Sequence, residues 1–247
     1  MATPRLVTIP YSHYCEKARW ALERGGVSFI EETHAPLFAW RGALGAGGRR
    51  TVPAFVTDER TFPESTDVLR WVDAHGRPPE PYFPPGASDV ESLVDMFDRR
   101  LGPATRRVVY DHFLRGSRAD MQELLTTNIP SWEARGVRML RGFIPLVIRR
   151  GLKIDEAGVA RSKKTFDEVF AAVEERLADG RKTLTGEAFT GADLTFAALA
   201  APIVMPPAYV AHFGGLARLP PSLAALRESV LATKAGAFAM RIYESYR

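Results

Sequence analysis

The sequence contains almost no cysteine, no long apolar run and no large excess of charge of either sign. Its 247 residues include one cysteine, Cys15, so an intramolecular disulfide cannot form and a disulfide-stabilised secreted scaffold is excluded. No run of about 18 apolar residues occurs, so no membrane-spanning helix is expected. The first residues lack a basic stretch followed by an apolar one, so no signal peptide is expected either. These absences together predict a cytoplasmic protein.

The composition is that of an ordinary globular protein. Hydrophobic residues make up 46% of the chain, which is enough for a substantial core and too much for a disordered chain. Lys and Arg number 33 against 29 Asp and Glu, which gives a formal net charge of +4. This excess is too small to indicate nucleic-acid binding, and no nucleic-acid partner is expected.

A proline-rich segment divides the chain. Residues 77–88 contain five prolines in twelve positions, and each proline fixes φ and removes a backbone donor. Helix and central strand are therefore both excluded there, and the segment is predicted to be a stiff linker. It separates an expected domain of residues 1–76 from a longer one of residues 89–247.

The first part alternates between strand-like and helix-like patterns. The expected strands are 6–9, 27–33, 53–57 and 61–62, and the expected helices are 16–24 and 65–74. Residues 35–50 are rich in glycine and alanine and are predicted to be irregular, with at most a short helix. The order β-α-β-(α)-β-β-α indicates an α/β unit with a mixed sheet.

The second part shows helical patterns and no convincing strand. The expected helices are 89–115 with a kink at Gly102-Pro103, 162–177, 194–205 and finally 221–233. Thr190 and Asp193 have the spacing of a capping box, in which the carboxylate reaches back to the amide of the capping residue.

The sharpest candidate site lies where the first strand gives way to the first helix. Ser12 is in this loop, and the following helix N-terminus favours a bound anion. Two interpretations remain open: Ser12 either caps the helix or helps to hold a thiolate. His13 could act as a base, although a loop histidine is more often at the surface. Cys15 shares a helical face with Ala18 and Leu22, which favours packing over redox chemistry.

Two further segments could bind a peptide-like ligand. Pro53 stands at the start of a strand, and a cis Val52–Pro53 bond would turn the backbone amide and carbonyl of Val52 outward. Glu64 and Ser65 precede the next helix, where amides and a hydroxyl suit a carboxylate and Glu64 suits an ammonium group. An ordinary capped helix is the alternative for this second segment.

Four motifs, taken in order, resemble those of the glutathione S-transferase superfamily. They are Ser-His-Tyr-Cys-Glu-Lys-Ala-Arg (12–19), Thr-Val-Pro-Ala-Phe (51–55), Pro-Glu-Ser-Thr-Asp-Val-Leu (63–69) and Phe-Thr-Gly-Ala-Asp-Leu-Thr-Phe-Ala-Ala-Leu (189–199). The resemblance covers residues 5–75 and 88–247. It implies a thioredoxin-like α/β domain with a mixed four-stranded sheet (β-α-β-α-β-β-α), followed by an all-helical domain. It also implies glutathione as co-substrate, no metal, and a homodimer.

The resemblance assigns roles to individual residues. Ser12 falls where the family places the residue that stabilises the glutathione thiolate, and counting back from Arg19 favours Ser12 over Tyr11. Val52 would pair with the cysteinyl part of glutathione, and Pro53 would be the family's cis proline.

Further residues would hold the two ends of glutathione. Glu64 and Ser65 would bind the γ-glutamyl end, and Arg50 is the preferred residue for the glycyl carboxylate, with Arg49 or Trp40 as alternatives. Because Ser12 replaces the first cysteine of a Cys-x-x-Cys pair, dithiol chemistry is excluded.

The resemblance implies that the protein is a glutathione transferase. Such an enzyme would conjugate glutathione to a small hydrophobic electrophile and would act in detoxification. The sequence does not identify the electrophile, although Tyr110, Phe113, Trp132 and His112 are candidates for its site. Two alternatives remain: a glutathione-binding interaction or ligand-carrier protein, and a glutathione-dependent reductase or isomerase working through Cys15.

Residues 130–153 carry six basic residues against Glu133 alone, interleaved with apolar ones. The basic residues are Arg135, Arg138, Arg141, Arg149, Arg150 and Lys153. A core helix with a solvated basic face is favoured over contact with an anionic membrane surface. The net charge of this segment, +5, exceeds that of the whole chain, whereas residues 1–76 carry equal numbers of basic and acidic side chains.

Overall fold

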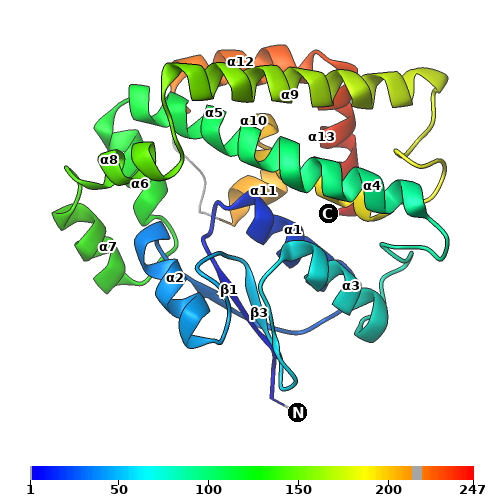
Figure 1. Cartoon of the computed structure of the whole chain (residues 1–247), viewed down its shortest axis with the longest axis horizontal. Helices are drawn as coiled ribbons and strands as arrows, with labels where there is room; N and C mark the ends of the chain where they lie inside the picture. Colours follow the sequence, from blue (N-terminus) through cyan, green and yellow to red (C-terminus); the bar gives the residue numbers. More distant parts are fainter. Residues whose placement is uncertain (1, 213–218) are drawn as a thin grey trace.

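The N-terminal half is a four-stranded sheet flanked by three helices, as expected. The computed structural model describes residues 2–212 and 219–247. The strands are β1 (Arg5–Thr8), β2 (Ile30–Thr33), β3 (Ala54–Val56) and β4 (Thr61–Phe62), and the helices are α1 (His13–Arg24), α2 (Pro36–Gly45) and α3 (Ser65–His75). The sheet order is β2-β1-β3-β4, with β1 parallel to β2 and the other pairs antiparallel. Figure 1 labels its two central strands, β1 and β3.

Two boundaries in this half differ from the sequence prediction. Helix α1 begins at His13 rather than residue 16, because Ser12 caps it and the loop after β1 is correspondingly short. Strand β2 begins at Ile30 rather than residue 27, since Val27 is still tied to the end of α1 through a bond from its amide to the Leu22 carbonyl (2.9 Å).

The expectation of an irregular segment at 35–50 was largely wrong, because α2 occupies residues 36–45. Pro36 occupies the first turn, where a missing amide is tolerated. Gly42, which suggested looseness, instead permits close packing: a Cβ there would lie 3.1 Å from Val7 Cγ1 in β1. The helix can therefore lie directly against the sheet.

The C-terminal half consists of helices, as predicted. They are α4 (Ser88–Met96), η1 (Phe97–Leu101), α5 (Gly102–Arg115), α6 (Arg118–Thr126), α7 (Ser131–Met139), α8 (Ile144–Gly151), α9 (Glu156–Arg176), η2 (Leu177–Asp179), α10 (Gly191–Val204), α11 (Pro207–Ala211), α12 (Pro221–Leu231) and α13 (Lys234–Tyr246). Helix α13 was missed: Thr233 caps it by accepting from the Gly236 amide (3.0 Å). Helix α9 starts earlier than predicted because Asp155 caps it.

Helices α4 and α5 form one long rod joined by a π-helical turn. This turn, η1, ends at Leu101, immediately before the Gly102-Pro103 pair where the sequence predicts a kink. Such turns are often found at functional sites. Here the turn directs Asp98 and the Gly102 carbonyl toward the first helix of the other half.

Helix α10 is the centre of the molecule. All fourteen of its residues are buried, which agrees with its apolar character on every side. The predicted capping box is present, since Asp193 accepts from the Thr190 amide (2.9 Å) and also from the Leu184 amide (2.7 Å). One contiguous hydrophobic cluster runs from the sheet through α1 and α10 to α13, so the two halves share a core. No helix in the described part of the chain is both long and apolar enough to cross a membrane.

Candidate functional site

Ser12 lies at the N-terminus of α1, between the end of β1 and the helical half. Its Oγ accepts from the Cys15 amide at 3.4 Å, and its own amide donates to the Ile9 carbonyl (3.0 Å). A hydroxyl has one proton and two lone pairs, so a cap of this kind leaves the Ser12 proton available for a further acceptor. Capping and anion binding are therefore compatible at this residue, and the two sequence interpretations do not exclude each other.

The next two residues attach α1 to the helical half. His13 Nε2 lies 3.0 Å from the Gly102 carbonyl oxygen, and Tyr14 donates to the Asp98 carbonyl at 2.7 Å. Gly102 is required for this fit, since a Cβ there would lie 2.1 Å from the Tyr14 hydroxyl oxygen. The first turn of α1 is thus positioned from both sides.

The expectation that His13 lies at the surface was wrong. The side chain is 4% exposed, and burial, with the nearby Arg106 charge, lowers the pKa of His13 to about 3. The backbone contact with Gly102 lies 89 residues away in the sequence, so no local pattern indicates it. A neutral, buried imidazole bonded to a carbonyl is a structural residue and a poor base at neutral pH.

Cys15 is buried, as its helical spacing predicts. Its side chain has no exposed surface, and burial raises the pKa of the thiol to about 11. A thiol in this environment has almost no thiolate at neutral pH and is inaccessible to a disulfide. This geometry does not favour the reductase or isomerase chemistry considered for Cys15.

Val52 lies beside this helix start, at the mouth of the sheet. The Val52–Pro53 peptide is cis. Val52 lines a groove together with Ile9, which comes three residues before Ser12 in the chain. Two grooves of about 640 Å³ and 590 Å³ meet at Thr51 and Val52.

One groove leads toward the start of α3. Ser65 is 4% exposed and lines it, together with Glu64, which occupies the N-cap position without capping through its side chain. The Glu64 carboxylate is more than half exposed and lies 3.2 Å from Arg49. The exposed carboxylate can bind an ammonium group, and the free amides at the helix start can bind a carboxylate group.

The other groove leads toward α2. Arg50 is exposed and lines it, with its guanidinium 5.8 Å from the centre of the Trp40 ring. Arg49 points to Glu64 at the first groove instead. The two arginines therefore lie at different grooves. Arg50, next to Trp40, remains the candidate residue for binding a carboxylate at this end.

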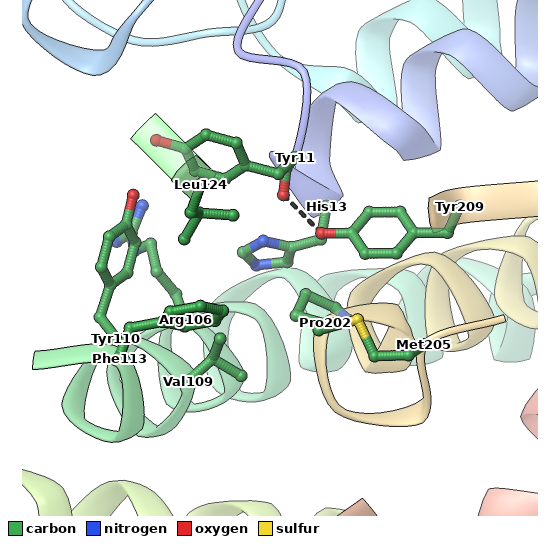
Figure 2. Close-up of a pocket in the computed structure, with 10 residues that line it drawn as sticks. All are labelled: Tyr11, His13, Arg106, Val109, Tyr110, Phe113, Leu124, Pro202, Met205 and Tyr209. Carbon is green, nitrogen blue, oxygen red and sulfur yellow. Dashed lines mark hydrogen bonds between the residues drawn. The ribbon is translucent and has the colours of Figure 1, made fainter. Parts of the chain in front are cut away.

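A small cavity lies between α1, α5 and α11, and the two chain neighbours of Ser12, Tyr11 and His13, line it (Figure 2). Its volume is about 40 Å³, enough for about one ordered water. Of the four residues considered for an electrophile site, Tyr110 and Phe113 line it. His112 instead contacts Ser222 (2.8 Å), and Trp132 packs edge-on against Phe38.

Tyr11, the alternative to Ser12 in the sequence, also lines this cavity, together with Arg106 and Tyr209, which the sequence did not indicate. The Tyr11 hydroxyl is buried, and burial raises its pKa well above the usual value, so it is a neutral phenol. Tyr209 donates to the Tyr11 carbonyl, and Arg106 lines both the cavity and the groove near Ser65. The only sequence signal that could have placed Arg106 near the site is the pattern of buried apolar residues in α5, which indicates the face of this helix that packs inward.

A buried ion pair also joins the halves next to the site. Lys17 has no exposed side-chain surface and lies 2.8 Å from Asp98, and it donates to the Thr66 hydroxyl at 2.6 Å. Burial lowers the pKa of Lys17, while Asp98 opposes that shift. No group of three or more metal-ligating side chains occurs within residues 2–212 and 219–247.

A mixed four-stranded sheet with a cis proline, joined to a helical half, defines a thioredoxin-like domain followed by a helical domain. A family model described as "Glutathione S-transferase, N-terminal domain" matches residues 6–80, and one described as "Glutathione S-transferase, C-terminal domain" matches residues 156–229. Together they span more than half of the chain. The chain belongs to the glutathione S-transferase superfamily.

Solved structures share this fold at low sequence identity. A glutathione S-transferase of Ceriporiopsis subvermispora in complex with glutathione has a TM-score of 0.65 and 13% identity, with 100% of this chain and 98% of that one covered. The β-etherase LigF from Sphingobium sp. strain SYK-6 has a TM-score of 0.60 and 17% identity, covering 97% and 99%. A glutathione S-transferase of Methylobacterium radiotolerans in complex with glutathione sulfonate has 0.55 and 18%, covering 96% and 94%. Comparison with curated protein sequences found no match.

Proposed function

We propose that the protein is a glutathione transferase in which Ser12 stabilises the glutathione thiolate. The observation that carries this proposal is the position of Ser12 at the N-terminus of α1, a helix whose residue Tyr14 lines one of the two grooves that meet at Val52. The Ser65 groove suits the γ-glutamyl end of the tripeptide, and the Arg50 groove suits the glycyl carboxylate. The backbone of Val52 between them suits the cysteinyl part.

Helix α1 and Ser12 then act on the thiol. A free thiol has a pKa of about 8.5, so little thiolate exists at neutral pH. The Ser12 proton and the partial positive charge of the helix N-terminus both favour the anion. The thiol proton goes to solvent, the sulfur electron pair forms the bond to carbon, and the leaving group departs with its own electron pair.

The electrophile is proposed to approach from the side of the small cavity. Tyr110 and Phe113 supply an apolar wall there. The cavity is too small for an organic substrate as it stands, so α5 and α11 have to separate slightly when the electrophile binds. A ligand-carrier protein remains the second candidate, because tight glutathione binding alone would also use the Val52 grooves.

Substitution of Ser12 by alanine tests the proposal. We expect turnover with 1-chloro-2,4-dinitrobenzene to fall by about 10²-fold, because a preorganised donor to a developing or bound anion is lost. Glutathione affinity, measured by calorimetry, should change little. Ser12→Thr should retain part of the activity, since it keeps the hydroxyl.

Ser117 offers a matched control for the capping role. It caps α6 by accepting from the Asp120 amide at 3.0 Å, away from the proposed site. Ser117→Ala should lower stability by about 1 kcal/mol, as Ser12→Ala does, without loss of turnover. If both variants lose the same stability and neither loses turnover, Ser12 is only a cap. Glutathione binding without any turnover in the parent protein would favour the carrier function.

A further inference from the structure

Exposed apolar side chains gather at one end of the molecule. Helices α7 and α8 and the turn between them, residues 130–153, form this end, which we call the α7–α8 tip (Figure 1). Five of the eight large hydrophobic side chains that are exposed in the described part of the chain belong to it. They are Trp132 (59%), Met139 (85%), Leu140 (44%), Phe143 (57%) and Leu146 (48%). The segment is therefore not the single core helix with a solvated face that its sequence favours.

Basic side chains occur in the same segment as these apolar ones. All six cations of the tip are exposed, and none of them forms an ion pair with another described residue: Arg135, Arg138, Arg141, Arg149, Arg150 and Lys153. Elsewhere, exposed arginines commonly have partners, as in the pairs Arg70–Glu91 and Arg100–Glu168. The tip thus presents concentrated and uncompensated positive charge.

The single acidic residue of the tip does not offset this charge at the surface. Glu133 is fully buried, accepts from the Ala35 amide at 2.7 Å, and lies 2.6 Å from His34 Nδ1. It therefore fastens α7 to the start of α2. Ile144 and Ile148 are buried on the other side of α8. The exposed apolar side chains accordingly belong to an anchored element.

We propose that the α7–α8 tip docks onto the surface of an anionic lipid bilayer. Apolar side chains at the turn would enter the headgroup region, and the arginines of the tip would contact lipid phosphates and carboxylates. A second copy of the same face would bring two sets of unpaired cations together, which opposes self-association there. A nucleic acid would use the cations but would leave Met139, Leu140 and Leu146 exposed.

Docking at this tip would bring the membrane surface close to one of the proposed glutathione grooves. Val147 and Gly151 of α8 line the same groove as Trp40 and Arg50, so this groove lies next to the element that we propose to face the membrane.

Co-sedimentation with vesicles tests the proposal on the full chain. We expect binding to vesicles that contain phosphatidylserine, weak binding to pure phosphatidylcholine, and loss of binding at high salt. Combined substitution of Arg138, Arg141 and Arg149 by glutamine should lower the partition coefficient by about a hundredfold, since each basic residue near an anionic surface contributes about fivefold. Circular dichroism and gel filtration check that the variant is folded.

Two further variants separate the contributions. Replacing Phe143 and Leu146 by serine should weaken binding by about tenfold or more, because apolar insertion is lost while the charge is kept. Combined substitution of Arg60, Arg77 and Lys234 by glutamine removes the same charge from exposed positions outside the tip and should leave binding nearly unchanged.

Three results would overturn the proposal. The first is absence of binding to anionic vesicles at low salt, and the second is equal loss of binding in the tip variant and the charge-matched control. The third is self-association in analytical ultracentrifugation that the serine variant abolishes, because this would assign the apolar tip to a second copy of the chain.

Discussion

Acidification should destabilise the protein through His13. The pKa of His13 is about 3 in the folded state, owing to burial, against an ordinary value of 6.5. Between these two values the unfolded chain binds a proton that the folded chain does not, so the free energy of unfolding decreases as pH falls through 6.5 toward 3. From neutral pH to about pH 4 this amounts to about 3 kcal/mol.

The variant His13→Gln should lack this contribution. A glutamine amide can still donate to the Gly102 carbonyl, and it does not titrate. We expect urea denaturation to show that the free energy of unfolding falls between neutral pH and about pH 4 in both proteins. This fall should be about 3 kcal/mol smaller in the variant than in the parent protein. Asp193 acts in the opposite direction, since burial raises its pKa to about 6, but it is present in both proteins and its effect cancels.

Titration of His13 followed by NMR can refute this reasoning directly. If the imidazole resonances of His13 titrate near the ordinary pKa in a folded sample, the buried neutral state is wrong. Equal changes of unfolding free energy with pH in the two proteins would refute the argument in the same way, since any stability lost in the variant would then come from altered packing alone.

Three further predictions concern the junction between the halves. Asp98→Asn should destabilise the protein by about 3–5 kcal/mol in chemical denaturation, because Lys17 keeps a buried charge without its counter-ion; a loss under about 1 kcal/mol would show that the pair is solvated. Gly102→Ala should displace Tyr14 and reduce turnover through the first turn of α1, whereas unchanged kinetics would mean that the 2.1 Å approach is relieved elsewhere. Cys15 should react with iodoacetamide at under about 1% of the rate seen in the unfolded chain, since the thiol is buried and mostly protonated; rapid labelling of the native protein would restore the redox alternative.

Local patterns predicted the parts of the site that depend on neighbouring residues. A strand, a short loop and a helix place Ser12 at a helix N-terminus, and the apolar spacing of Cys15 with Ala18 predicts its burial. These features need no knowledge of distant residues. The Val52–Pro53 bond is cis, which the resemblance to the family implied and the local pattern alone did not show.

Features that depend on distant contacts were not predicted. His13 was assigned to the surface because its carbonyl partner, Gly102, is far away in the sequence. Helix α2 was expected as at most a short helix in an irregular segment, because its glycines were interpreted as a sign of looseness, whereas Gly42 allows contact with β1. The exposed tip was assigned to a core helix, since sequence alternation does not show which face remains uncovered.

The attachment of α1 limits how the two halves can be recombined. Ser12 belongs to the N-terminal half, yet the residues that follow it are held by Gly102 and Asp98 of the other half. A chimaera that joins this N-terminal half to a relative's helical half would keep the serine but lose its alignment, unless a glycine and a backbone carbonyl recur at the same turn. Grafting η1 together with the first turn of α5 should therefore restore activity to such a chimaera. These few residues form the smallest unit that has to be inherited jointly with the serine.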